Sequence, residues 1–127
     1  MAERTDAHIF LRLAYQAMIN AGLPAEAILA KAGVALSRLD DSSASRTPNA
    51  AQTIFWQAAE EVSRDPHVGL HMGEHMPLYR GQVLEYLFTS SPTFGEGLRR
   101  AMNFHRLLSD ALTGELVIEG EQCYLRT

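Results

Sequence analysis

The chain has 127 residues, of which 46% are hydrophobic and 20% are charged. This length fits one ordinary domain, and the balance of apolar and charged residues excludes an intrinsically disordered chain. The net charge is -4, whereas a chain that neutralises nucleic-acid phosphates is normally basic, so we expect no specific DNA binding by these residues.

Two features of the sequence bear on where the protein works. Cys123 is the single cysteine, which excludes an internal disulfide and any CxxC metal or redox motif. Residues 1–6 are polar and charged, and no run approaches the roughly 20 apolar residues that a membrane helix needs. We therefore expect a cytoplasmic protein that has no membrane partner.

The first part of the chain predicts a helical hairpin. A first helix is expected from about Asp6, which is a plausible N-cap, to Ala21, where Gly22 ends it. Leu23-Pro24 opens a short second helix, and Gly33 takes the left-handed conformation that ends it. Residues 34–46 lose the helical periodicity and predict an exposed loop.

The middle of the chain predicts two further helices. Thr47-Pro48 is expected to supply the N-cap and the first position of a third helix. The apolar stripe of this helix consists of Ile54, Phe55, Ala58, Ala59 and Val62. Asp65 can cap a further helix and Pro66 can take its first position, which predicts a helix through about His75 that Pro77 ends.

The last part predicts two helices and two strands. A helix is expected over Gln82 to Phe88, and Thr93 followed by Glu96 predicts a capping box for the next one. The expected inner face of that helix is Phe94, Leu98, Ala101, Met102, His105, Leu108 and Leu112. After Gly114 the period changes to 2, which predicts strands 115–119 and 122–126 joined by Gly-Glu.

These elements define the expected fold class. It is α+β and mostly helical, with about five to six helices followed by a C-terminal antiparallel β-hairpin. Because an isolated hairpin is marginally stable, we expect either that the polypeptide continues after Thr127 or that the last strand pairs with a second chain, giving a homodimer.

Three segments together carry a resemblance to a known family. They are GLPAEAILAKAGVALSRLDDSSASRTP at 22–48, DPHVGLHMGE at 65–74 and GQVLEYLFTSSPTFGEGLRRAMNFHRLLSD at 81–110. In order and spacing they resemble the N-terminal effector domain of bacterial AraC-type transcription regulators, in the branch labelled arabinose-binding. The resemblance implies that residues 1–127 form a regulatory domain that senses a small-molecule effector or mediates dimerisation. It also implies that this domain is truncated here, and that a C-terminal helix-turn-helix domain, absent from these residues, binds DNA.

The order of helices and hairpin is also distantly similar to haem-based nitric-oxide sensor domains. In those sensors a helix carrying an Asn-x-x-His-like segment ligates the haem, and His105 in Met102-Asn103-Phe104-His105 falls at a comparable place. The Tyr-x-Ser-x-Arg motif that holds the haem propionates is missing from this sequence. We therefore expect no haem cofactor.

The candidate effector-contacting residues are Phe94, Leu98, Met102 and His105, since a ligand pocket combines apolar walls with a few polar groups. The alternative is that His105 is a core histidine whose nitrogens find a backbone or side-chain partner.

His67, His71 and His75 stand at i, i+4 and i+8, and such a stripe can ligate a divalent metal. Because neither a nearby cysteine nor the His-Glu-x-x-His order is present, we expect solvated histidines and no bound metal.

No constellation for catalysis is found. Ser90 and Ser91 precede a proline in a turn, Cys123 has no neighbouring histidine in sequence, and no Gly-rich phosphate loop follows a strand. We therefore predict that the protein is not an enzyme. Two functions remain: a regulatory domain of a transcription regulator, and a stand-alone haem- or metal-binding sensor.

Overall fold

The computed structural model describes residues 2–39, 46–77 and 82–126. The chain divides into two compact units, Met1–Pro77 and Leu78–Thr127. The described part of the first unit contains β1 (Thr5–Ala7), α1 (Ile9–Asn20), α2 (Ala25–Lys31), the 3-10 helix η1 (Leu36–Arg38), β2 (Arg46–Pro48), α3 (Ala50–Ser63) and α4 (Val68–Met72). That of the second contains α5 (Val83–Thr89), α6 (Phe94–Asn103), the 3-10 helix η2 (His105–Leu107), β3 (Glu115–Glu119) and β4 (Gln122–Arg126). The predicted α+β class with a C-terminal hairpin is confirmed.

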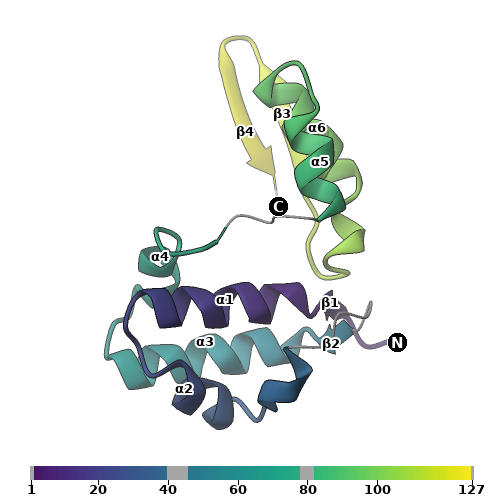
Figure 1. The fold of residues 1–127 in the computed structure, drawn as a ribbon. Coiled ribbons are helices and arrows are strands. Elements are labelled where there is room, and N and C mark those ends of the chain that lie inside the picture. The colour runs from purple at the N-terminus through teal and green to yellow at the C-terminus, as the bar shows by residue number, and fades with distance from the viewer. Residues whose placement is uncertain (1, 40–45, 78–81, 127) are drawn as a thin grey trace. The chain divides into compact units, whose positions relative to one another are not determined.

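A single apolar core holds the first unit together. In it α2 packs against both α1 and α3, and α4 contacts the same two helices (Figure 1). The core consists of Leu11, Ala14, Ala17, Met18, Ala25, Ile28, Leu29, Ala32, Leu39, Phe55, Ala58, Ala59, Val68 and Met72. In α3 the predicted stripe is correct at Phe55, Ala58 and Ala59, but Ile54 is 46% exposed, so the buried face is narrower than expected.

A short antiparallel sheet at one end of this unit was not predicted (Figure 1). Asp6 was expected to cap the first helix, and Thr47-Pro48 to begin the third. Instead Asp6 pairs with Thr47 between β1 and β2, and the helices begin at Ile9 and Ala50. The Asp6 carboxylate accepts a hydrogen bond from Asn49 Nδ2 at 2.9 Å. Residues suited to capping therefore serve a pairing between segments that are distant in sequence.

The turns that separate the first helices follow the sequence signals. Gly22 and Gly33 have φ values of 74° and 71°, the left-handed conformation that glycine adopts without strain. The predicted exposed loop at 34–46 contains η1, and it places Leu39 in the core. Its most polar stretch, residues 40–45, lies outside the described residues.

The helix predicted from Asp65 to His75 is shorter than expected. α4 comprises five residues, Val68–Met72, and the chain continues in turns in which His75 N–H bonds to the Met72 carbonyl. Gly73 disfavours a longer helix because glycine loses more backbone freedom there than other residues do. The three histidines of this segment therefore do not share one helix.

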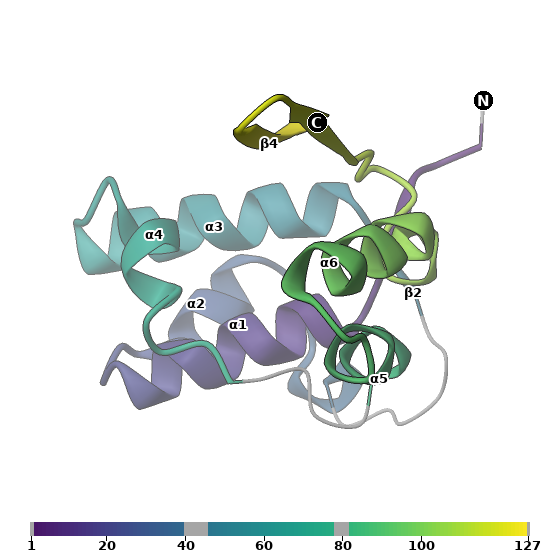
Figure 2. The same cartoon turned by 90° about the horizontal axis from the view of Figure 1, so that it is seen from above.

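The second unit consists of a helical pair and a hairpin. α5 packs against α6 (Figures 1 and 2), and α6 contacts β3 (Figure 1). The hairpin has the predicted strands, with Glu115 opposite Arg126 and Glu119 opposite Gln122, and Gly120 in its turn has a φ of 61°. In the part of the chain that the structure describes, no helix combines the length and the apolar character needed to cross a bilayer.

The predicted last helix, which was expected to continue past His105 to Leu112, ends at Asn103 instead. The His105 ring is hydrogen-bonded through Nδ1 to the Met102 carbonyl. In a continuing α-helix that carbonyl would accept the N–H four residues later. Here the His105 side chain bonds to that carbonyl, and the backbone tightens into η2, in which Leu108 N–H bonds to the His105 carbonyl.

Candidate functional site

A close approach between α5 and α6 organises the second unit. Gly97 is the buried residue of α6, and a Cβ atom built on it would lie 2.8 Å from the carbonyl oxygen of Phe88. The rings of Phe88 and Phe94 meet edge to face, with centroids 5.3 Å apart. Thr93 Oγ1 accepts the Glu96 N–H at 3.2 Å, as the predicted capping box requires at the helix start.

The predicted effector-contacting residues lie along α6 and its continuation. Phe94, Leu98 and Met102 are spaced by four residues in α6, and His105 lies in η2. Leu98, Met102 and His105 are half-buried, whereas Phe94 is 73% exposed and faces solvent apart from its contact with Phe88. The predicted inner face is therefore only partly correct, because Gly97 occupies the buried position and Leu112 is also exposed.

His105 has one satisfied and one unsatisfied nitrogen. Nδ1 is bonded to the Met102 carbonyl, as the interpretation of a histidine with a backbone partner predicted. Nε2 is buried and has no hydrogen-bond partner among the described residues. Since buried polar atoms in folded proteins are nearly always hydrogen-bonded, this nitrogen requires an explanation.

Met102 connects the surroundings of His105 with the hairpin. A Cβ atom built on Gly114 would lie 2.9 Å from Met102 Sδ, so the thioether lies against the chain immediately before β3 begins at Glu115. A larger residue at this position would require the Met102 side chain to move. Met102 thus touches the base of the hairpin with its side chain and holds His105 with its carbonyl.

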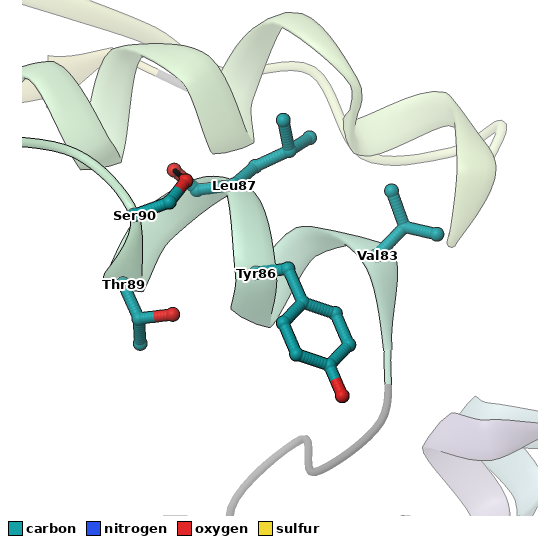
Figure 3. Close-up of a pocket in the computed structure, with 5 residues that line it drawn as sticks. All are labelled: Val83, Tyr86, Leu87, Thr89 and Ser90. Atoms are coloured by element: carbon teal, nitrogen blue, oxygen red, sulfur yellow. Dashed lines mark hydrogen bonds between the residues drawn. The ribbon is translucent and has the colours of Figure 1, made fainter.

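An open cavity of about 360 Å³ lies along α5 (Figure 3). Its lining residues are Val83, Tyr86, Leu87, Thr89 and Ser90, which all come from α5 or the residue after it. None of the predicted effector-contacting residues lines it. The spacing of Val83, Tyr86 and Ser90 at i, i+3 and i+7 is the sequence signal that could have identified this face.

A second cavity, of about 300 Å³, lies in the first unit. Its walls come from α2, from η1 and from the turn between them. The lining is apolar except for Glu26, with Leu29, Ala30, Val34, Ala35 and Leu36 as the other residues. This cavity could not be predicted from the sequence, because its residues have the pattern of ordinary helix and loop positions.

The structure does not place the three histidines that were weighed as metal ligands on one helix, although the ring centroids of His67 and His71 lie 6.4 Å apart. His67 precedes α4, His71 lies within it and His75 follows it. His71 Nδ1 lies 2.5 Å from Asp65 Oδ2, and Asp65 Oδ1 accepts the His67 N–H at 2.9 Å. These hydrogen bonds, the one from His71 first, lower the pKa of Asp65. Over residues 2–39, 46–77 and 82–126, no three His, Cys, Asp or Glu side chains are grouped so that they could hold a metal ion.

One face of the hairpin is apolar. The register places Leu116 opposite Leu125 and Ile118 opposite Cys123, so these four side chains share a face. Ile118 and Leu125 are about half exposed, and Cys123 is exposed as well. The other face is polar at its ends, where Arg126 pairs with Glu115 at 3.6 Å and the Tyr124 hydroxyl donates to Glu119 at 3.0 Å.

Comparisons with known proteins identify the family of the chain. The family described as the arabinose-binding domain of AraC transcription regulators, N-terminal, matches residues 22–127. No curated protein and no solved structure matches the chain, so the predicted similarity to haem-based nitric-oxide sensors gains no support and stays a prediction. The prediction of a regulator rather than an enzyme agrees with the family. Because the match covers most of the chain, the protein belongs to the N-terminal arabinose-binding domains of AraC transcription regulators, and its role is that of their ligand-binding regulatory domain.

Proposed function

We propose that this domain senses its small-molecule effector at Leu98, Met102 and His105, with Phe94 at the exposed end of the same helix. The observation that carries the proposal is the buried, unsatisfied Nε2 of His105. Leaving such an atom unpaired costs about 1–3 kcal/mol, which a polar group of a ligand would recover. Leu98 and Met102 contribute half-buried apolar side chains of the kind that form the walls of small-molecule sites.

A buried nitrogen also explains how binding could be detected by the rest of the protein. An effector reaches Nε2 only if the segment around η2 rearranges, so occupancy and conformation are linked. Met102 lies between His105 and Gly114, at the base of the hairpin. A ligand that moves Met102 therefore changes the position of the chain that enters β3.

The site is tested by a ligand screen on the whole chain. Compounds that raise the melting temperature are measured again with His105→Asn, since the Asn amide can donate to the Met102 carbonyl but lacks Nε2. His75→Asn is the matched control, because His75 is exposed. We expect binding to weaken about tenfold or more in His105→Asn and to persist in the control. Ligands that bind both variants as tightly as the native chain contradict the proposed site.

We further propose that DNA is bound by a separate helix-turn-helix domain of the regulator and not by these residues. The net charge of -4 and the family support this division. A mobility-shift assay on the regulator's own promoter is expected to show binding by a polypeptide that includes the helix-turn-helix motifs and none by residues 1–127. A specific shift by residues 1–127 alone contradicts the division.

We also propose that the hairpin pairs with a second copy of the chain. Its apolar face is exposed at Ile118, Cys123 and Leu125. Two β4 strands that pair antiparallel about Tyr124 would join two such faces, and would set each Arg126 opposite Gln122 and next to Glu121 of the other copy. That arrangement is complementary in charge and covers an open strand edge.

Light scattering tests the dimer. Leu125→Lys is expected to give a monomer, whereas Leu70→Lys, at a side chain that is 78% exposed in the first unit, leaves the dimer intact. A native chain that is monomeric at high concentration rejects the proposal. So does a longer polypeptide that is monomeric because further strands of its own domain occupy the edge.

A second candidate, a haem-binding sensor, is favoured by one observation. Metal-ligating histidines usually bond through their other nitrogen to a carbonyl or carboxylate, as His105 Nδ1 does with the Met102 carbonyl. An absorption spectrum decides between the two functions. A Soret band that disappears in His105→Asn supports haem binding, and its absence after haem is added favours the organic effector.

A further inference from the structure

The position of the proton on His105 follows from its hydrogen bond. A backbone carbonyl can only accept, so the nitrogen that bonds to the Met102 carbonyl, Nδ1, carries the hydrogen. In the neutral ring the other nitrogen then has a free lone pair and is an acceptor. The unsatisfied atom, Nε2, therefore requires a donor.

The other residues of the proposed site limit the rest of the ligand. Leu98 and Met102, the half-buried residues of that site on α6, have apolar side chains, and none of the described residues bonds to Nε2. A polyol brings several hydroxyl groups, each of which needs its own partner once it leaves water. A ligand that is apolar apart from one hydrogen-bond donor needs only one partner, and Nε2 of His105 is such a partner.

We propose that the effector is an apolar molecule that donates one hydrogen bond, from a hydroxyl or an N–H group, to Nε2 of His105. The proposal rests on the proposed effector site and names the chemical class that this site takes. It excludes two other classes. A carboxylate offers only acceptors to the lone pair, and a sugar leaves most of its hydroxyl groups without partners among the apolar side chains.

The tautomer of His105 is the first measurement. The chain has five histidines, and ¹⁵N correlation spectra of the rings distinguish protonated from unprotonated nitrogens. His105→Asn removes one set of signals and thereby assigns it. At about pH 8, where an ordinary imidazole is neutral, we expect His105 to carry its hydrogen on Nδ1. A ring that is protonated on Nε2 overturns the proposal.

A matched set of probes is the second measurement. Cyclohexanol and methoxycyclohexane share an apolar ring, but only the alcohol can donate; cyclohexanecarboxylate and L-arabinose represent the excluded classes. We expect cyclohexanol to shift the Nε2 signal and to bind about tenfold or more tightly than the ether, because the ether leaves a buried acceptor unpaired. The same titration should move the amide signals of β3 next to Gly114, since Met102 contacts that glycine.

The outcomes separate this proposal from the one on which it rests. The proposal of an apolar effector with one donor is overturned if the ether, the carboxylate or L-arabinose binds as tightly as cyclohexanol. It is also overturned if cyclohexanol at its solubility limit leaves the ¹⁵N signal of Nε2 unchanged. The effector site itself fails by a different result, namely that the compounds found by the ligand screen bind His105→Asn as tightly as the native chain. A ring ¹⁵N signal of His75 that moves as cyclohexanol is added identifies a non-specific effect and also counts against the proposal.

Discussion

Substitution of glycine by alanine is expected to have opposite effects on stability at two positions of α6. Gly97 lies against α5, and a Cβ atom there would be 2.8 Å from the Phe88 carbonyl oxygen and 3.1 Å from the Phe88 ring. Gly95, one residue after the helix begins, would meet nothing within 4 Å. The pair therefore separates intrinsic helix propensity from packing within one helix.

The magnitudes follow from two competing effects. Alanine in place of glycine stabilises a helix by about 1 kcal/mol, and somewhat less in the first turn. Overpacking a close contact costs about 1–3 kcal/mol, and the upper part of that range applies at Gly97 because the contacted atom belongs to the backbone. We therefore expect Gly95→Ala to raise the free energy of unfolding by about 0.5–1 kcal/mol and Gly97→Ala to lower it by about 1–2 kcal/mol.

Urea unfolding followed by circular dichroism measures both variants, and hydrogen exchange of the α5 and α6 amides locates the effect. Trp56, the single tryptophan, lies in the first unit and gives a separate fluorescence signal for it. If Gly97→Ala stabilises the protein as much as Gly95→Ala does, the two helices are not in close contact and the account of the second unit is wrong.

Three further predictions concern the core, a helix cap and a charged pair. Phe55→Ala should lower the free energy of unfolding by about 3–5 kcal/mol, because the ring is fully buried; the half-buried Leu98→Ala should cost about 1–2 kcal/mol, and thermal melts that rank them equally would refute this. Thr93→Ala removes the cap on Glu96 N–H and should cost about 1 kcal/mol in urea unfolding, while Thr93→Ser retains most of it. The His71 hydrogen bond lowers the pKa of Asp65, so its stabilising effect is complete above the usual aspartate pKa and is lost as the pH falls through the lowered value. Acid titration of Asp65→Asn should lack this part of the pH dependence, and an unchanged profile contradicts the assignment.

Local signals predicted the elements of this fold better than their ends. The glycines at 22 and 33, the cap at Thr93 and the alternation after Gly114 each act within a few residues, and each is confirmed. The predictions for Asp6 and Thr47 were wrong because their side chains suit a helix cap, whereas the pairing of β1 with β2, across some forty residues, decides their conformation. Such pairings leave no local pattern in the sequence.

The residues of the proposed site were chosen from the apolar periodicity of the sequence, which did not predict their local structure. The sequence placed His105 on an apolar face with Leu98 and Met102; in the structure Leu98 and Met102 lie in α6, and His105 lies in η2, which follows it. Periodicity could not indicate that the helix would end at Asn103 or that the His105 side chain would bond to the Met102 carbonyl there. It also could not distinguish Gly97, the buried position, from the larger apolar residues on either side.

The distribution of buried side chains has a consequence for synthesis on the ribosome. All the fully buried apolar side chains of the described residues lie between Ile9 and Met72, whereas the second unit buries only Gly97 and Ser109. The first unit can therefore form its core before the remainder of the chain has been translated. The later segment emerges with Phe94, Ile118 and Leu125 still exposed to water. Exposed apolar surface promotes aggregation, so we expect the later segment to be the more prone of the two to aggregate during translation.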